Sequence, residues 1–326
     1  MQRRLKKFIA NIICLFISEK EKRKEVRKRI CNKVIYSNEI DKYIKNNGGR
    51  DSIEPWAFIR VRNEIVTIDS CLKSILPAIK KGVIGYNDCD DGTEEYIIEF
   101  CKQNSGFIPA KFPYSVDARY ESKEQIEITK KNLAEYYNYV LSFIPKNEWL
   151  IKIDCDHVYN AEKLKKLFYL PKTENDIVII SRLDLHYFKG AIYTITKNPL
   201  VELKDHFLLK NKNLEFKMTS WEFERNGKKY FANMEGLYKN GKNLVSSSME
   251  KEVNFIYTEL TNWHFPLIKN WRYGIEDIFE DKELILLSEY KKIAPINTKI
   301  DINMLDENKI MEICKNFNLR RDRILP

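Results

Sequence analysis

The 326-residue chain lacks several features that mark other classes of protein. Its seven cysteines include no C-x-x-C pair, so a structural zinc knuckle is not expected, and their odd number indicates reduced thiols in a cytosolic protein. The apolar stretch near the N-terminus, from Phe8 to Ile17, covers ten residues, whereas a membrane-spanning helix needs about 20. The apolar content of 44% nevertheless suffices for the core of one large domain or two modest ones.

The net charge of +9 is confined to one end of the chain. Residues 1–33 contain twelve Lys or Arg and three Glu, so the remaining residues are neutral overall. A nucleic-acid enzyme usually spreads basic surface over its folded body, and we therefore expect no nucleic-acid partner. Residues 1–36 fit a basic amphipathic arm at an anionic membrane surface. A helix packed on its own domain is the alternative.

Strands and helices are predicted to alternate after a polar linker over residues 37–54, which contains Gly48 and Gly49. This alternation predicts an α/β fold with a mostly parallel sheet and helices on both faces. Beyond residue 190 the pattern weakens to a hairpin turning at Asn226 and Gly227 and a mainly helical region over 271–326. The predicted strands are 56–64, 82–88, 110–114, 148–154 and 176–188, and the predicted helices are 67–82, with Pro77 in its last turn, 91–102, capped by Thr93, 123–143 and 161–170.

Polar side chains follow the predicted strands at their carboxyl ends, where parallel sheets bind their ligands. Arg60 and Arg62 alternate with apolar residues, and their guanidinium groups suit either a diphosphate or acids on the sheet rim. The remaining polar residues at the four strand ends are Asn63 and Glu64, then Asn87 and Asp88, then Asp154 and Asp156, then Arg182 and Asp184.

Two D-C-D tripeptides stand among these residues. The first, residues 88–90, fails as an EF-hand loop because Cys89 and Ile98 occupy ligand positions. The second consists of Asp154, Cys155 and Asp156. Two carboxylates on a turn can hold Mn²⁺ or Mg²⁺ and leave positions open for diphosphate oxygens. A D-x-D alone is usually a solvated turn, but its place after the fourth strand favours a metal site.

Two further acids and one histidine need a choice between function and structure. Asp88 and Asp91 can accept hydrogen bonds from uracil N3–H or ribose hydroxyls, although the sequence NDCDDGT also suits a turn and a helix cap. His264, in TELTNWHFP, is a candidate third metal ligand, although a lone histidine among aromatics is commonly a core residue.

Several long segments resemble the bacterial lipooligosaccharide β-1,4-N-acetylgalactosaminyltransferases, which build ganglioside-mimicking outer cores. The resemblance covers roughly residues 55–190 and 255–266 and rests on PWAFIRVRNE, SILPAIKKGVIGYNDCDDGTEE, SFIPKNEWLIKIDCDHVYNAEKL, SRLDLHYF and TELTNWHFP. It implies a GT-A-type, Rossmann-like glycosyltransferase with a UDP-sugar donor and a divalent cation. Asp154 and Asp156 match the D-x-D positions, and His264 completes the metal site. Asp88 and Asp91 fall in the nucleotide region, whereas Asp90 stands where the family carries threonine.

The resemblance also implies a domain plan and a reaction. Residues 55–270 form the glycosyltransferase domain, with a nucleotide-sugar half over 55–160 and an acceptor half over 161–270. N-acetylgalactosamine passes from UDP-N-acetylgalactosamine to a galactose of the lipooligosaccharide, with inversion. Asp184 and Glu259 are the candidate bases. Residues 1–33 would hold the enzyme on the cytoplasmic face of the inner membrane.

Three alternative functions remain open from the sequence. The same transferase could use UDP-glucose, UDP-galactose or UDP-N-acetylglucosamine. A sugar nucleotidyltransferase would need a Gly-rich phosphate loop, and WAFIRVRNE contains no glycine. A non-catalytic membrane-binding module would have little reason to gather polar residues at four strand ends.

Overall fold

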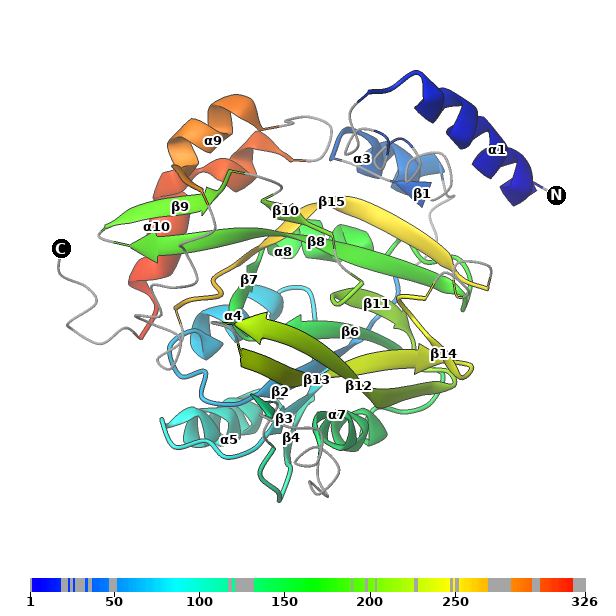
Figure 1. The fold of residues 1–326 in the computed structure, drawn as a ribbon. Helices are drawn as coiled ribbons and strands as arrows, with labels where there is room; N and C mark the ends of the chain where they lie inside the picture. Colours follow the sequence, from blue (N-terminus) through cyan, green and yellow to red (C-terminus); the bar gives the residue numbers. More distant parts are fainter. Residues whose placement is uncertain are drawn as a thin grey trace.

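The computed structural model has an α/β fold with one large sheet and one small sheet (Figure 1). It describes residues 2–18, 23, 26, 33–34, 37–46, 52–116, 119–120, 132–188, 190–196, 199–202, 204–225, 228–246, 249, 252–268, 283–294 and 300–318.

The large sheet has twelve strands and is parallel in its main parts. Its central path runs β1-β15-β8-β11-β6-β2-β3-β4, and β11 alone on this path lies antiparallel to both of its neighbours. The mostly parallel α/β sheet predicted from the sequence is therefore confirmed. These strands are β1 (Lys33–Val34), β2 (Trp56–Val61), β3 (Lys81–Tyr86), β4 (Phe107–Lys111), β6 (Trp149–Asp154), β8 (Asp176–Phe188), β11 (Phe207–Lys210) and β15 (Asn254–His264).

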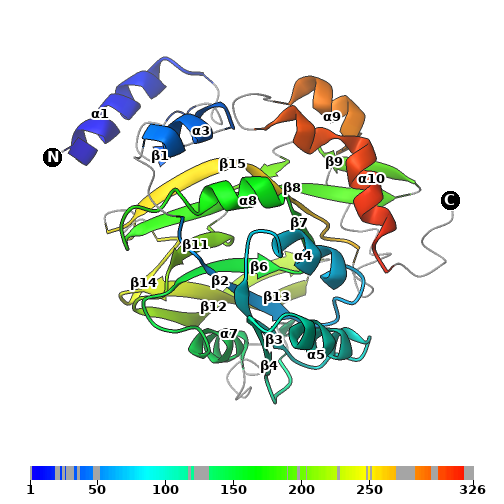
Figure 2. The ribbon, with the colours of Figure 1, turned by 180° about the vertical axis from the view of Figure 1, so that it is seen from behind.

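Both faces of the parallel strands are buried, which explains their nearly continuous apolar sequences. In β2, Ile59 belongs to one hydrophobic cluster and Phe58 to the cluster on the other face, because successive side chains alternate. The first cluster includes side chains of α4 (Ile68–Ile75), α5 (Thr93–Gln103) and α8 (Ala161–Leu167), and the second includes those of α7 (Leu133–Ser142) (Figure 2).

The small sheet covers part of the second face. Its hairpin pairs Arg225 with Lys228, which fits the predicted turn, although the turn residues 226 and 227 lie outside the described residues. Phe216 and Leu237 join the same cluster as α7, so this sheet packs against the large one. Its strands are β12 (Leu214–Arg225), β13 (Lys228–Lys239), β14 (Lys242–Asn243) and β5 (Arg119–Tyr120).

The C-terminal region is joined to the large sheet by a third hydrophobic cluster. Side chains of β15, including Trp263, pack there against α9 (Leu287–Ile293) and α10 (Glu307–Lys315). The region is not purely helical, because β16 (Leu284–Leu286) pairs with β9 (Ala191–Ile195), which in turn pairs with β8. The other short elements are β7 (His157–Tyr159), β10 (Leu200–Val201) and the 3-10 helix Ile302–Leu305.

The N-terminal part differs from the predicted linker. Residues 37–46 form α3 (Ser37–Asn46), and β1 pairs in parallel with β15, so this part is attached to the sheet. The preceding helix α1 (Gln2–Leu15) lies at the edge of the molecule in both views (Figures 1 and 2). Among the described residues, no helix has both the length and the apolar character that crossing a membrane requires.

Several predicted boundaries shift for identifiable reasons. Strand β8 covers residues 176–188 as predicted, so Asp184 lies inside the strand and not at its end. Thr93 is the first residue of α5 and not its cap, because Gly92 occupies the N-cap with φ of 93°, a left-handed conformation that favours glycine. Helix α4 ends at Ile75, just before Pro77. Helix α7 begins at residue 133, where Asn132 and Glu135 form a capping box, and residues 123–131 of the predicted longer helix lie outside the described part.

Candidate active site

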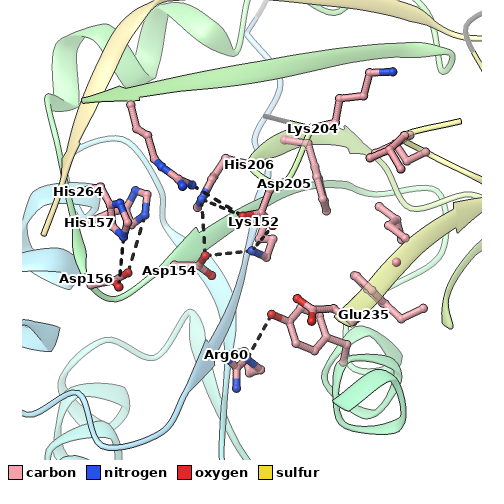
Figure 3. Close-up of a pocket in the computed structure, with 18 of the residues that line it drawn as sticks. Arg60, Lys152, Asp154, Asp156, His157, Lys204, Asp205, His206, Glu235 and His264 are labelled. Atoms are coloured by element: carbon pink, nitrogen blue, oxygen red, sulfur yellow. Dashed lines mark hydrogen bonds and ion pairs between the residues drawn. The ribbon is translucent and has the colours of Figure 1, made fainter. Parts of the chain in front are cut away.

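A cavity of about 820 Å³ opens between the large and the small sheet. The large sheet contributes residues from the end of β6 and the start of β11. The small sheet contributes residues from its two long strands, β12 and β13. Figure 3 shows side chains from both sheets pointing into the same space. Its lining includes Arg60, Glu64, Tyr137, Lys152, Asp154, Asp156, His157, Arg182, Lys204, Asp205, His206, Phe216, Thr219, Glu235, Asn243 and His264.

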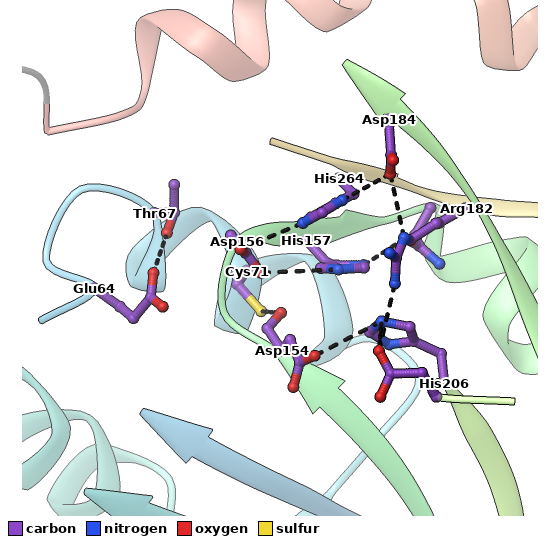
Figure 4. Close-up of polar contacts among 12 residues, drawn as sticks. Glu64, Thr67, Cys71, Asp154, Asp156, His157, Arg182, Asp184, His206 and His264 are labelled. Carbon is purple, nitrogen blue, oxygen red and sulfur yellow. Dashed lines mark hydrogen bonds and ion pairs between the residues drawn. The ribbon is translucent and has the colours of Figure 1, made fainter. Parts of the chain in front are cut away.

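Strand pairing brings distant polar residues into one row. His264 of β15 pairs with His157 of β7 on one side and with Asp184 of β8 on the other. Directly paired residues point to the same face of a sheet, so these side chains must meet. The rings of His157 and His264 stack with their centroids 4.3 Å apart, and the His206 ring lies tilted against His157 with a centroid distance of 4.4 Å (Figure 4).

His264 lies between two carboxylates. Its Nε2 is 3.4 Å from an Asp156 oxygen, and its Nδ1 is 2.7 Å from Asp184 Oδ1. Burial opposes the charged form, yet Asp156 and Asp184 raise the pKa of His264 above its usual value. A carboxylate on one ring nitrogen and an acid beside the other is the arrangement of a histidine that binds a metal through its second nitrogen.

Asp154 is held by a buried ammonium group. The Nζ of Lys152, whose side chain is 5% exposed, lies 2.9 Å from Asp154 Oδ2 and 3.1 Å from Asp205 Oδ1. Burial alone would raise the pKa of Asp154, but the Lys152 ammonium outweighs it and lowers that pKa well below its usual value. The carboxylate is therefore ionised and faces the cavity from the end of β6.

His206 and His157 are neutral imidazoles. Burial, reinforced by the Lys152 ammonium, lowers the pKa of His206 to about 4. Burial, with the neighbouring histidines, also lowers the pKa of His157 well below its usual value. Neither ring nitrogen of His206 has a hydrogen-bond partner within the described structure, although its Nε2 is 3.6 Å from Asp154 Oδ2. A buried imidazole with a free lone pair beside a carboxylate suits a metal ligand.

Two overlapping sets of side chains could hold a metal ion. One comprises Asp156, His157 and His264, and the other comprises Asp154, His157 and His206. In each set the ligand atoms all lie within 4.8 Å of one another. The carboxylates and imidazoles present therefore fit a divalent cation. Of the predicted ligands, Asp156 and His264 fall in one set, whereas Asp154 falls in the other.

The predicted nucleotide-binding residues divide into two groups. Arg60, Glu64 and Asp154 line the cavity. Arg60 is half-buried, its Nε donates to the Tyr137 hydroxyl at 3.2 Å, and its guanidinium carbon lies 5.3 Å from the centre of the Tyr137 ring. The other residues gather beside the ends of β2 and β3 without lining the cavity, namely Arg62, Asn63, Asn87, Asp88 and Asp91.

Asp91 shapes the local backbone. It accepts hydrogen bonds from the backbone N–H groups of Ile65 and Thr93 and from the Thr93 hydroxyl. The turn-and-cap interpretation of its sequence therefore accounts for its contacts. Asp88 has a positive φ of 44° and accepts a hydrogen bond from the Ser115 hydroxyl.

The two candidate bases lie outside the cavity lining. Asp184 contacts His264 and accepts from Arg182 Nε at 3.2 Å. Glu259 is 1% exposed and forms a buried ion pair with Lys163 at 2.8 Å, close to Asp301 of the C-terminal region. Carboxylates bound in this way orient or stabilise their partners, and neither faces the space where a substrate would bind.

The sequence interpretation missed His157, His206, Lys152, Asp205 and Glu235 as residues of the site. His157 had a visible signal, because it directly follows the second D-C-D tripeptide. His206 had none, because it reaches Asp154 through β11, a short antiparallel strand that the alternating pattern does not reveal.

The α/β sheet places acids and histidines beside the carboxyl ends of its strands, and the family match shows that the chain is a glycosyltransferase. The chain belongs to the β-1,4-N-acetylgalactosaminyltransferase (CgtA) family, whose model matches residues 44–318. The resemblance and the enzyme class expected from the sequence are confirmed. The match extends across the small sheet and into α10, so both parts lie within the region that the family model describes.

Other comparisons are weaker. No curated protein matches the sequence. Among solved structures, glucosyl-3-phosphoglycerate synthase from Mycobacterium tuberculosis, in complex with Mn²⁺, UDP and phosphoglyceric acid, is 16% identical with a TM-score of 0.27 over 48% of this chain and 51% of that one. The chain thus spans about half the length of that protein. A Bacillus anthracis protein assigned as a glucose-1-phosphate thymidylyltransferase, crystallised with sucrose, is 9% identical with a TM-score of 0.31 over 64% of this chain and 87% of that one.

Proposed function

We propose that this glycosyltransferase moves N-acetylgalactosamine from UDP-N-acetylgalactosamine to a galactose of a lipooligosaccharide outer core, in a metal-dependent, inverting reaction that forms a β-1,4 linkage. Membership of the family over residues 44–318 carries the proposal. The cavity supports it, because about 820 Å³ is within the range of sites that enclose small ligands.

The nucleoside of the donor is proposed to bind at the ends of β2 and β3. Asn87 is buried, and its Oδ1 has no hydrogen-bond partner within the described structure, so it is available to a ligand. Asn63 and Asp88 both have positive φ, and such backbone strain is concentrated at functional sites. The Asp88 carboxylate is proposed to accept a hydrogen bond from a ribose hydroxyl or from uracil N3–H. Asp91 holds the turn in shape.

Asp156 and His264 are the proposed metal ligands, with Asp154 beside them. A divalent cation bound there neutralises negative charge on the departing diphosphate. The nearby imidazoles of His157 and His206 favour Mn²⁺ over Mg²⁺, because nitrogen ligands suit transition metals better than they suit Mg²⁺. Arg182 lines the same side of the cavity and adds a fixed positive charge.

Asp184→Ala should weaken Mn²⁺ binding about 10- to 100-fold, because the carboxylate that orients a metal-binding histidine contributes about that much. Saturating Mn²⁺ should then restore most of kcat. Glu259→Gln, outside the cavity, should leave the Mn²⁺ dissociation constant unchanged. Titration calorimetry gives the Mn²⁺ dissociation constant of each variant, and assays over a range of Mn²⁺ concentrations give kcat. A kcat that stays low at saturating Mn²⁺ would instead favour Asp184 as the base.

The basic arm is proposed to place the enzyme on the cytoplasmic face of the inner membrane. Large apolar side chains on α1 and just after it are exposed, with Phe8 at 63%, Leu15 at 79% and Phe16 at 86%. Ile9, Ile12 and Ile13 on the same helix are each more than 40% exposed. An apolar surface beside a run of Lys and Arg is the feature of helices that bind anionic lipid surfaces.

Replacing Phe8 and Phe16 together by Glu should reduce binding to vesicles of phosphatidylcholine and anionic phosphatidylglycerol by at least about 100-fold, given about 1.5–3 kcal/mol for each buried phenyl group. Activity on a lipid-anchored acceptor should fall, while activity on a short soluble oligosaccharide should not. Ile293→Glu, an equally exposed apolar residue on α9, is the control. Equal loss on both acceptors would indicate a folding role for the arm.

A donor screen tests the function itself. UDP release is followed with each UDP-sugar, with lactose or sialyl-lactose as acceptor, and with Mn²⁺ present or chelated. Mn²⁺-dependent turnover with UDP-N-acetylgalactosamine is expected. Turnover with UDP-glucose, UDP-galactose or UDP-N-acetylglucosamine would change the proposed donor, and turnover that survives chelation would refute the metal dependence.

A further inference from the structure

We propose that Glu235 is the catalytic base that removes the proton from the acceptor hydroxyl. This inference rests on the proposed function and assigns the role of base to a residue that the sequence did not suggest. Glu235 lies on β13 of the small sheet, is partly exposed and lines the cavity. An inverting transfer needs a carboxylate that faces the reacting hydroxyl and is free to accept its proton.

The other acids of the cavity are already engaged. Asp154 and Asp156 belong to the proposed metal site. Asp205 accepts from the buried Lys152 ammonium at 3.1 Å and lies 3.7 Å from Arg182 Nη1, and the Lys152 charge lowers its pKa below the usual value. Glu64 is 6% exposed and accepts from the Thr67 hydroxyl at 3.5 Å.

Glu235 has no hydrogen bond or ion pair within the described structure. Its negative charge acts on Arg60 and Lys152 through space, and it contributes to the raised pKa of each. The positive charges of Arg60 and Lys152 stabilise negative charge on this side of the cavity. They therefore favour a reaction in which negative charge moves from the acceptor oxygen to the leaving group. The carboxylate itself stays available for a proton.

The position of Glu235 matches the direction of the displacement. Figure 3 shows it on the small-sheet side of the cavity, across from Asp156, His157 and His264. In an in-line displacement the acceptor enters opposite the leaving group, so the base and the diphosphate site lie on opposite sides of the anomeric carbon. The diphosphate belongs on the histidine side, which leaves the small-sheet side for the acceptor.

The step is a balanced proton and glycosyl transfer. The Glu235 carboxylate takes the proton of the acceptor hydroxyl while that oxygen forms a bond to the anomeric carbon. The bond from this carbon to the diphosphate oxygen breaks, and its electron pair leaves with UDP. An α-linked donor thereby gives a β-linked product, and Glu235, now a carboxylic acid, returns its proton to water.

Glu235→Gln tests the assignment, because it keeps the side-chain shape and removes the basic oxygen. We expect kcat to fall about 10²- to 10⁴-fold, the usual contribution of a general base, while the dissociation constants for UDP and Mn²⁺ and the thermal midpoint stay at wild-type values. Glu235→Asp should retain partial activity. Glu215→Gln, an exposed glutamate on the facing strand β12, is the matched control and should behave as wild type.

The outcomes separate this inference from the proposed function. A wild-type enzyme that transfers sugar with inversion, together with a Glu235→Gln variant of near-normal kcat, would overturn the assignment and leave the function intact. Loss of turnover in Asp205→Asn with normal turnover in Glu235→Gln would move the base to Asp205. A product with retained α configuration would overturn both the proposed inversion and the base. Wild-type inactivity with every UDP-sugar would refute the proposed function itself.

Discussion

Asp156→Asn is expected to abolish metal-dependent transfer. Asp156 is 4% exposed, lines the cavity and lies 3.4 Å from His264 Nε2, so its carboxylate supplies negative charge to the proposed cation site. A bound cation contributes several kcal/mol to charge stabilisation, and a loss of about 4 kcal/mol corresponds to roughly a thousandfold lower turnover. The Mn²⁺ dissociation constant should rise in parallel, as measured by titration calorimetry with the transfer assay.

The matched control for this variant is Asp176→Asn. Asp176 is also a buried carboxylate of the large sheet, but it accepts from the backbone of Lys172 and Thr173 at the start of β8, away from the cavity. It should lower the free energy of unfolding without changing Mn²⁺ affinity. An unchanged Mn²⁺ dissociation constant in Asp156→Asn would show that the cation binds elsewhere in the protein.

Lys152→Met is expected to destabilise the metal-free protein strongly. The Asp154 and Asp205 carboxylates raise the pKa of Lys152 well above its usual value against the effect of burial, so the ammonium is charged at neutral pH. Its removal leaves Asp154 and Asp205 without their shared cation. We expect a loss of about 3 kcal/mol in the free energy of unfolding, at the lower end of the range for breaking a buried pair because Asp205 is partly exposed.

Lys81→Met is the control for Lys152→Met, because it removes a lysine whose ion pair has a similar N···O distance but is exposed to solvent. The Lys81 ammonium lies 3.1 Å from Glu148, and the two side chains are 30% and 42% exposed. Surface pairs of this kind contribute at most about 1 kcal/mol, so urea denaturation followed by circular dichroism should separate the two variants clearly. Mn²⁺ should recover part of the stability of Lys152→Met, because it restores positive charge beside Asp154. Equal losses in the two variants would argue against a buried charge pair.

The large sheet was predictable because both of its faces are covered. Strands such as β6 and β8 are apolar over most of their length, and the helices between them have apolar residues at helical spacing. Such patterns involve residues that are close together in the chain, so they can be recognised from the sequence alone. Helix α3 and strand β1 were hidden by polar composition, because they are held by the edge of the sheet and not by strong patterns of their own.

The candidate site was only partly predictable. The polar ends of parallel strands point to one rim, which identified Asp154 and Asp156 from sequence. Asp184 was predicted to be a candidate base, and the structure places its Oδ1 2.7 Å from His264 Nδ1 and outside the cavity lining. Glu235 comes from the small sheet, and the packing of this sheet against the large one cannot be recognised from local sequence periodicity.

The sequence by itself determined the family, the α/β class, the position of the D-x-D acids and the concentration of positive charge in residues 1–33. These properties depend on residue identity and on short-range spacing. Only the tertiary structure decided that the rings of His206 and His264 both contact His157, that Lys152 neutralises Asp154, and that a second sheet brings Glu235 to the cavity. The physical reason is that strand pairing and burial, which set these distances and the pKa values that follow from them, join residues as far apart in the sequence as His157 and His264.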